Sequence, residues 1–252
     1  MTEVEIHTWA TWLEIFLAAV TFVALLFITA PYGRHRRSGW GPTVSNRVGW
    51  IAMELPAVAV FGWIFLQGEH RAESVPLVFL GLWQIHYIHR VFIFPLRLRT
   101  KGKRMALAIA GMAITFNCLN AYVNARWISH FGAYASDWLL DPRFIAGVAV
   151  FALGFGINLK ADQILLNLRK PGETDYKVPR GWLYEYVSCP NYLGEIIEWA
   201  GFALATWSLA GLAFALYTAA NVGPRAFANH RWLREQFPDY PANRKALIPF
   251  LL

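Results

Sequence analysis

The stretch Trp9–Ala30 reads WATWLEIFLAAVTFVALLFITA, and Glu14 is its only ionisable residue. A helix of about 20 mainly apolar residues crosses the roughly 30 Å hydrocarbon core of a bilayer, so this stretch predicts a membrane-spanning helix. Only Ser208 separates the last two apolar stretches, whose combined length of 37 residues favours a helical hairpin over one long helix. With the first stretch, six more predict an all-α bundle of seven transmembrane helices: Val48–Leu66, Val75–Leu96, Met105–Val123, Phe144–Leu159, Asn191–Trp207 and Leu209–Phe227.

The composition supports a membrane protein. Of 252 residues, 56% are apolar and 15% are charged, and the mean hydropathy is +0.35. Soluble domains carry about 25% charged residues, and disordered chains carry fewer apolar ones. Two cysteines, Cys118 and Cys189, are too few for a disulfide scaffold. We therefore expect a single transmembrane domain over residues 1–252, with no separate soluble domain.

Lysine and arginine alternate between the connections of the predicted bundle. The segment before the first span has none, and the connection around Ser129–Pro142 has none. The first, third and fifth connections and the C-terminal tail are basic. Because basic loops stay on the cytosolic side, we expect the N terminus outside and the C terminus in the cytosol. This topology accounts for the net charge of +7, so no nucleic-acid partner is predicted.

Several costly polar groups lie within the predicted spans. An ionisable side chain there costs about 2.5 to 3.5 kcal/mol and usually faces a partner or a cavity. Asn191, Glu195 and Glu198 are spaced i, i+4, i+7 on one helix face, and Asn158 and Asp162 are spaced i, i+4. Glu54 and Arg90 lie in the second and third spans. They indicate an internal functional site, although mutual pairing in a packed bundle remains the alternative, and we interpret Glu14 as structural.

Other catalytic patterns are missing from the sequence. It has no Gly-x-Ser-x-Gly elbow and no Walker loop, and Gly154-Phe155-Gly156 lacks the third glycine of a dinucleotide fingerprint. His86 and His89 are spaced i, i+3 without a zinc-enzyme motif, so we expect no metal. Any nucleotide is then expected to be held by basic loop residues and polar helix ends on the cytosolic face.

Seven motifs, in order, resemble those of the steroid 5α-reductase family and cover nearly the whole chain. The element at residues 191–195 is also similar to elements of sterol reductases and isoprenylcysteine methyltransferases, whereas Glu54-Leu55-Pro56 together with His86-Tyr87 narrows the resemblance to the reductases. The motifs are Tyr32-Gly33-Arg34-His35, Glu54-Leu55-Pro56, His86-Tyr87-x-His89-Arg90, Asn158-Leu159-Lys160-Ala161-Asp162, Leu168-Arg169-Lys170-Pro171-Gly172-Glu173, Asn191-Tyr192-Leu193-Gly194-Glu195-Ile196-Ile197-Glu198-Trp199 and Arg244-Lys245-Ala246-Leu247-Ile248-Pro249.

The resemblance implies an enzyme that uses NADPH to reduce the Δ4 carbon–carbon double bond of a 3-oxo-Δ4-steroid. Hydride addition to an enone builds negative charge on the carbonyl oxygen, which needs a hydrogen-bond or proton donor. We expect Tyr87 and Glu54 to polarise that carbonyl. Arg90 is expected to be a neighbouring structural or cofactor contact.

The resemblance also implies a set of cofactor contacts. Arginines suit phosphates, and amides and carboxylates suit a carboxamide or ribose hydroxyls. Glu198 has a structural alternative, in which it only supports a helix. The matching residues are Asn158, Asp162, Arg169, Tyr176, Asn191, Glu195, Glu198, Arg225 and Arg244, and Tyr32, Arg34, Lys101 and Lys103 are plausible additions from cytosolic connections.

Some residues depart from the animal members of the family. Leu233 replaces a tyrosine and Asn229 replaces a histidine, so the phosphate end of the predicted site is the least defined. Cys189-Pro190-Asn191-Tyr192 resembles the plant form of the motif, which suggests a bacterial or plant-like member. The natural substrate is therefore defined only as a hydrophobic, rigid enone.

The predicted architecture places the substrate mainly among the first four helices and the cofactor among the last three and the cytosolic loops. A steroid partitions into lipid, so we expect it to enter from the bilayer. The expected location is the cytoplasmic membrane in a bacterium and the endoplasmic reticulum membrane in a eukaryote. The sequence does not define an oligomeric state. Three alternatives remain: a reductase of another lipid enone, such as a polyprenal or an enoyl thioester, an S-adenosylmethionine-dependent methyltransferase, and a seven-span transporter or receptor.

Overall fold

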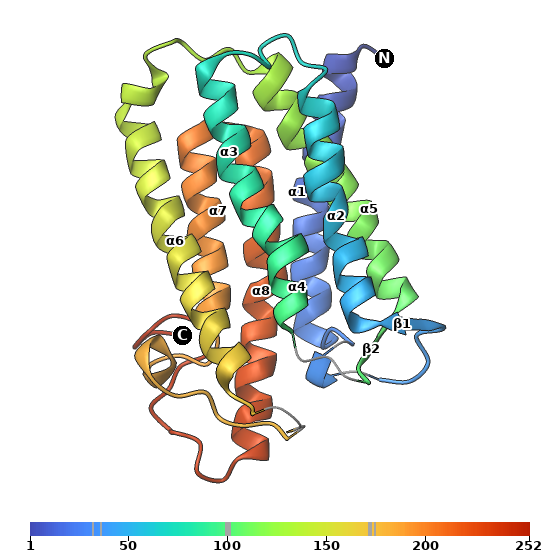
Figure 1. The fold of residues 1–252 in the computed structure, drawn as a ribbon, viewed down its shortest axis with the longest axis vertical. Coiled ribbons are helices and arrows are strands. Elements are labelled where there is room, and N and C mark those ends of the chain that lie inside the picture. Colours follow the sequence, from blue (N-terminus) through green and yellow to red (C-terminus); the bar gives the residue numbers. More distant parts are fainter. Residues whose placement is uncertain (32, 36, 99–101, 171–172, 174) are drawn as a thin grey trace.

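The computed structural model is a bundle of long, roughly parallel or antiparallel helices (Figure 1). It describes residues 1–31, 33–35, 37–98, 102–170, 173 and 175–252. Tyr32 and Lys101, two predicted site residues, lie outside this part of the chain. The helices are α1 (Glu3–Phe27), α2 (Asn46–Phe65), α3 (Ser74–Ile88), α4 (Phe94–Arg97), α5 (Leu107–Arg126), α6 (Pro142–Asn167), α7 (Pro190–Thr206) and α8 (Leu209–Gln236).

Each of the seven predicted apolar stretches overlaps one of these helices, so the helical class is confirmed. Five helical segments are long and apolar enough to cross a membrane, which identifies an integral membrane protein. They are α1, α2, Ser74–Arg97, Leu107–Phe131 and α6. Neither α7, with 17 residues, nor α8, which continues into a polar end, is among these five.

The hairpin between α7 and α8 is confirmed. Trp207 has a left-handed backbone with φ of 44°, which ends α7, and the Ser208 hydroxyl accepts a hydrogen bond from the Gly211 N–H at 3.0 Å to begin α8. Helix α8 then extends to Gln236, beyond its predicted end at Phe227. Water surrounds a helix end outside the bilayer, so apolar composition alone could not locate it.

Two short strands were not predicted. Strand β1 (Thr43–Ser45) pairs antiparallel with β2 (Arg104–Ala106) and ties the connection before α2 to the one before α5. Three residues are too few for a period-two pattern to appear in the sequence. The pair lies at the same end of the bundle as the C terminus, and the N terminus lies at the other end (Figure 1).

Helices α6 and α7 approach each other closely through small residues. A Cβ added at Gly154 would lie 2.2 Å from the backbone nitrogen of Glu198, and one at Gly194 would lie 2.5 Å from that of Asn158. Gly154 therefore serves packing, as small residues do between membrane helices. This contact brings the polar face of α6 beside that of α7.

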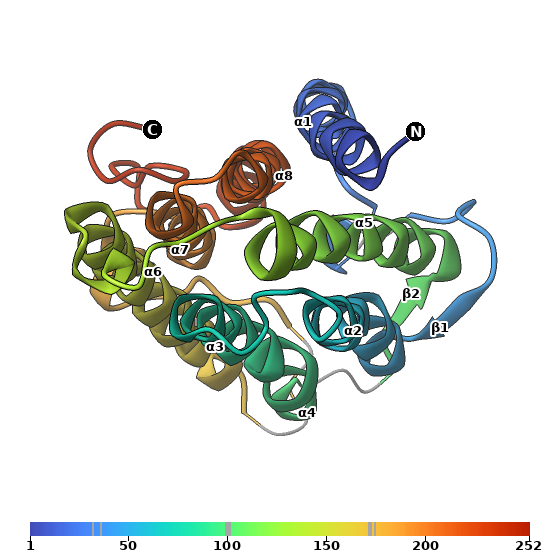
Figure 2. The same cartoon turned by 90° about the horizontal axis from the view of Figure 1, so that it is seen from above.

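Helix α1 stands at the edge of the bundle. Seen from above, it lies beside α8 and one end of α5, away from α3 and α6 (Figure 2). The main core, by contrast, is an aromatic cluster between α2, α3, α7 and α8 that includes Phe61, Trp83, Trp199 and Phe214. This rigid core forms one end of the cavity described next.

Candidate functional site

A cavity of about 470 Å³ lies between α1, α2, α3, α5, α7 and α8. Ligand sites usually occupy about 300 to 1,000 Å³ and are mainly apolar with a few placed polar groups. The cavity fits this description. Its polar and aromatic lining includes Trp50, Glu54, His86, Tyr87, Arg90, Asn117, Tyr192, Glu195, Trp199, Tyr217 and Arg225.

Glu54 and Tyr87 both line this cavity, at its end near the aromatic core. The Tyr87 ring packs 5.0 Å from that of Trp83 and 5.7 Å from that of Trp199, measured between centroids. No described residue bonds its hydroxyl, which remains available to a ligand. The Asn117 amide lies 3.5 Å from Glu54 Oε2 and donates to it weakly. The structure thus brings the two predicted catalytic residues to one place with spare hydrogen-bonding capacity.

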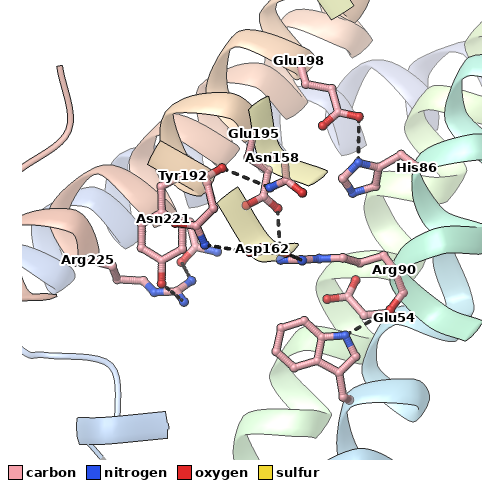
Figure 3. A network of polar contacts seen from close by, with 12 residues as sticks. Glu54, His86, Arg90, Asn158, Asp162, Tyr192, Glu195, Glu198, Asn221 and Arg225 are labelled. Carbon is pink, nitrogen blue, oxygen red and sulfur yellow. Dashed lines mark hydrogen bonds and ion pairs between the residues drawn. The ribbon is translucent and has the colours of Figure 1, made fainter. Parts of the chain in front are cut away.

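Arg90 is the centre of a buried ion-pair network (Figure 3). Its guanidinium donates to Asp162 Oδ2 at 2.9 Å and lies 3.8 Å from Glu195 Oε1. It also lies over the rings of Trp50 and Phe94, at 5.1 and 4.8 Å from their centroids. Both polar and π contacts therefore fix this side chain.

Local sequence explains the unusual backbone around Arg90. Residues His89–Ile93 form a π-helical turn in which the Phe94 N–H bonds the His89 carbonyl. Pro95 follows, and a proline has no N–H to continue an α-helical ladder and clashes with the carbonyl four residues earlier. The wider turn relieves that clash, and π turns often occur at functional sites.

The polar faces of α6 and α7 join this network. Asn158 Nδ2 donates to the Asn191 carbonyl at 3.0 Å, and Asn191 Nδ2 donates to Asp162 Oδ1 at 3.2 Å. Asp162 therefore receives Asn191 on one oxygen and Arg90 on the other. Four predicted cofactor contacts, Asn158, Asp162, Asn191 and Glu195, thus lie together with Arg90.

Glu198 has a different environment. It is fully buried, does not line the cavity, and accepts a hydrogen bond of 2.7 Å from His86 Nδ1. His86 does line the cavity. This geometry supports the structural alternative for Glu198, in which it orients a neighbour. Within the described residues no group of three or more His, Cys, Asp or Glu side chains is arranged to hold a metal.

Arg225 lies at the opposite end of the cavity from Tyr87. It donates to the Tyr192 hydroxyl at 3.0 Å, and Asn229 Nδ2 lies 3.4 Å from the same oxygen. Asn229 Oδ1 in turn pairs with His35 Nε2 at 3.0 Å. Asn229, which stands where the animal enzymes have a histidine, is thus hydrogen-bonded to His35 and Tyr192. These residues border a second cavity of about 230 Å³.

Three cations surround one aromatic ring next to this second cavity. Arg34, Lys103 and Arg169 lie 5.7, 5.5 and 5.7 Å from the centroid of Tyr176, and we call these four residues the Tyr176 cluster. Burial, and then the charges of Arg169 and Arg34, lower the pKa of Lys103. The cluster also borders a third cavity of about 440 Å³ that reaches Asp162. Such gathered positive charge suits phosphate groups.

Arg244 lines none of these three cavities. Its guanidinium donates to the Pro179 carbonyl at 2.8 Å and lies 3.4 Å from Glu185 Oε2, and the side chain is buried. It ties the C-terminal segment to the loop that carries Tyr176. A direct phosphate contact by Arg244 stays a prediction.

Several cavity residues were not predicted. Asn117 is a polar residue in an apolar span, a signal that the sequence does carry. Trp50 gave no such signal, because aromatic residues are common throughout this chain. Tyr192 lies in the motif at residues 191–199 but was not predicted as a contact. The indole of Trp50 donates to the Arg90 carbonyl at 3.2 Å and supports the ion-pair network.

Fold and site together define a helical integral membrane protein with an enzyme-like internal cavity and adjoining cationic pockets. The family model of 3-oxo-5-alpha-steroid 4-dehydrogenase matches residues 103–252. Steroid 5-alpha-reductase DET2 of Gossypium hirsutum is 44% identical over 93% of each chain. Its Arabidopsis thaliana counterpart is 45% identical over 94% of this chain and 93% of its own. The 3-oxo-5-alpha-steroid 4-dehydrogenase 1 of Mus musculus is 45% identical over 96% of this chain and 95% of its own.

The chain therefore belongs to the steroid 5α-reductase family, as its motifs indicate. It is a membrane oxidoreductase of steroid metabolism. Plant and rodent relatives match equally well, so the predicted plant-like character is not distinguished by overall identity.

Proposed function

We propose that this protein reduces the Δ4 double bond of a 3-oxo-Δ4-steroid to the 5α product with NADPH. The observation that carries the proposal is the meeting of Glu54 and Tyr87 in a mainly apolar cavity of about 470 Å³. An apolar cavity suits the rings of a steroid, and the two polar groups suit its single conjugated carbonyl.

Tyr87 and Glu54 act on the 3-carbonyl oxygen. As hydride reaches the β-carbon of the enone, negative charge grows on this oxygen, and a preorganised donor stabilises it. Tyr87 supplies an O–H whose ring is held by Trp83 and Trp199. Glu54, oriented by Asn117, shares the proton. The aromatic core keeps bulk water from this end.

The residues along the cavity fit a dinucleotide. NADPH, when bound, supplies the hydride. In this proposal Asn191, Glu195 and Arg90 bind its carboxamide or ribose, and Asp162 and Asn158 fix the positions of these side chains. In this proposal Arg225 and the Tyr176 cluster neutralise its phosphates. Support comes from the continuity of this cationic lining, because Arg225 and Tyr192 border both the first and second cavities.

In the proposed topology α7 and α8 complete seven spans, with the N terminus outside and the Tyr176 cluster in the cytosol. The alternation of basic connections and the opposite positions of the two termini support this orientation. The steroid enters from the bilayer. The membrane is the cytoplasmic one in a bacterium and that of the endoplasmic reticulum in a eukaryote.

The test is turnover by the protein purified in detergent. NADPH oxidation is followed by absorbance with and without progesterone, and the product is weighed by mass spectrometry. We expect steroid-dependent oxidation and a gain of two hydrogens. NADPH binding without steroid turnover would favour another lipid enone, such as a polyprenal or an enoyl thioester. Binding of S-adenosylmethionine in place of NADPH would favour a methyltransferase.

A further inference from the structure

Helix α1 buries a polar stripe that the proposed reaction does not use. Its large apolar side chains are mostly exposed at the edge of the bundle, whereas its buried residues are His7, Thr11, Glu14 and Ala18. The three polar positions are spaced i, i+4, i+7 and so share one helix face. In a membrane helix whose apolar side faces lipid, polar side chains on the inner side usually have a polar partner inside the bundle.

Helix α5 carries a matching stripe. Asn117, Asn120 and Asn124 are buried and spaced i, i+3, i+7 along it. Asn124 Nδ2 donates to Asn120 Oδ1 at 2.8 Å, which links two of the three amides. The third, Asn117, contacts Glu54. We call His7, Thr11, Glu14, Asn117, Asn120 and Asn124 the polar seam.

The two stripes lie on neighbouring helices and meet at His7. His7 Nε2 bonds the Val123 carbonyl at 2.9 Å, and α1 and α5 run in opposite directions (Figure 1). Seven residues of helix rise about 10 Å. Glu14 follows His7 by seven residues on α1, and Asn117 and Asn120 precede Val123 on the antiparallel α5. Glu14 therefore lies at about the same height in the bundle as Asn117 and Asn120. Asn117 lines the same cavity as Glu54 and Tyr87, so the seam reaches the catalytic end of the cavity.

Several polar atoms of the seam have no protein partner. Both carboxyl oxygens of Glu14, Nδ2 of Asn120 and Oδ1 of Asn124 form no hydrogen bond within the described residues. Glu14 and Asn120 are completely buried. Leaving one such group unsatisfied costs about 1 to 3 kcal/mol, and buried groups of this kind are normally bonded to internal water. Glu198 is equally buried but differs from Glu14, because its Oε1 bonds His86 and only its Oε2 has no partner among the described residues.

We propose that Glu14, Asn120 and Asn124 hold buried water and that this hydrated seam returns to Glu54 the proton that each turnover consumes. The proposal rests on the proposed function. Reduction adds one hydride, from NADPH, and one proton across the double bond. The proton leaves the Tyr87–Glu54 pair for the enolate. Glu54 then takes a proton from water at Asn117, Glu14 gives its proton to that water, and water near His7 reprotonates Glu14.

The amides and the carboxyl have different tasks in this seam. Asparagine side chains orient water without carrying the proton, whereas a carboxyl both gives and takes it. Glu14 acts through Glu54 and is therefore a positioning residue for the reaction. A carboxylate buried without a counter-charge is costly, and Glu14 forms no ion pair within the described chain, so it rests as the neutral acid.

The direct test uses wild-type protein in sealed liposomes. NADPH added outside reaches only molecules with the cofactor face outward, and the N-terminal end of the seam then faces the lumen. Outer pH is fixed, and lumenal pH is varied with impermeant buffer. We expect steroid-dependent oxidation to slow as the lumenal pH rises. A rate that is the same at every lumenal pH would overturn the delivery role.

Variants then locate the effect. Glu14→Gln should lower kcat about tenfold, leave the KM for steroid unchanged and remove the response to lumenal pH. Asn120→Leu, which removes one water partner, should slow turnover in the same direction. Glu69→Gln, an exposed carboxyl that is 4.0 Å from His130, should behave as wild type. A lumenal pH response that persists in both seam variants would contradict the assignment.

An infrared measurement needs neither cofactor nor steroid. The difference spectrum between wild type and Glu14→Gln should contain the carbonyl stretch of a protonated carboxyl, and D₂O should shift it. Absence of this band would contradict the proposal that Glu14 is a neutral acid bonded to water. If the band is present but no steroid is turned over, the proposed function and the delivery role fail together. Turnover without a lumenal pH response removes the delivery role alone.

Discussion

The Arg90 network and the Glu54–Tyr87 end of the cavity are both buried and polar, but they differ in how their groups are paired. In the network, Asp162 is bonded by Arg90 and Asn191, and the Arg90 guanidinium is held by two carboxylates and two rings. In the Glu54–Tyr87 part of the cavity, by contrast, no described residue bonds the Tyr87 hydroxyl, and the Glu54 carboxyl has one weak hydrogen bond.

The difference separates positioning from reaction. A group whose hydrogen bonds are all made by protein is held in place, and removing it leaves its partners unpaired. A group with unused capacity is able to bind a ligand without first losing a partner. Changes in the network should therefore act on stability, and changes at the cavity end should act on turnover.

The largest effect is expected from breaking the network. Arg90→Leu leaves the carboxylates of Asp162 and Glu195 without their cationic partner and should cost about 3 kcal/mol or more of unfolding free energy. Denaturation by sodium dodecyl sulfate, followed by tryptophan fluorescence, measures it. Arg97→Leu, on the same chain segment but exposed, is the control and should change stability by about 0.5 kcal/mol or less. Equal stability of the two variants would remove the contrast.

Changes at the cavity end should act on the reaction alone. Tyr87→Phe removes only the hydroxyl, which bonds no described residue, so stability should stay near that of wild type. Turnover should fall about 100-fold, because the developing charge on the carbonyl loses its donor. Steady-state assays measure kcat, with Tyr186→Phe, an exposed tyrosine, as the matched control. Unchanged kcat in Tyr87→Phe would contradict the proposed role.

The Tyr176 cluster should affect cofactor binding. Lys103→Met should raise the KM for NADPH about tenfold and leave kcat nearly unchanged, because a phosphate contact is made equally in the ground and transition states. Raising the ionic strength should reduce the difference. If Lys103→Met had the affinity of wild type, Lys103 would not belong to the phosphate site.

The same lysine predicts a pH dependence. Burial and neighbouring cations lower the pKa of Lys103, so its positive charge is present below this pKa and is lost as pH rises through it. Wild-type affinity for NADPH should therefore weaken at alkaline pH. Lys103→Arg keeps its charge and should hold its affinity over the same range. If the NADPH affinities of wild type and Lys103→Arg fell in parallel as pH rises, the loss of affinity would come from a group other than Lys103.

The smallest effect is expected at Glu198. Glu198→Gln keeps a side chain of the same shape that is able to bond His86, so kcat should fall only about threefold, equivalent to less than 1 kcal/mol. Steady-state kinetics at saturating NADPH would show it. A loss as large as that of Tyr87→Phe would place Glu198 in the reaction itself.

Much of the fold was predictable because the bilayer imposes a length on apolar segments. The seven helices and the break at Ser208 follow from that length. The small strands and the extension of α8 to Gln236 did not follow, since they lie where water satisfies the backbone. The π turn at His89–Ile93 was also missed, although Pro95 is its visible cause.

The candidate site was predictable where polarity is rare. Glu54, Arg90, Asp162 and Glu195 stood out against apolar neighbours, and the structure brings them to one region. Sequence could not separate Glu198, which faces His86, from Glu195, which faces the cavity, because both share one helix face. Glu14 was interpreted as structural, and this reading stays a prediction; the structure buries Glu14 fully, and its carboxyl bonds no described residue.

The central claim is hydride transfer to an enone held by Glu54 and Tyr87. It is tested most directly with NADPH deuterated at the transferred position and progesterone as substrate, by mass spectrometry of the product. The account predicts one deuterium at C5 from wild type, and the same label at a much lower rate from Tyr87→Phe. A product without deuterium, or equal rates from both proteins, would contradict it.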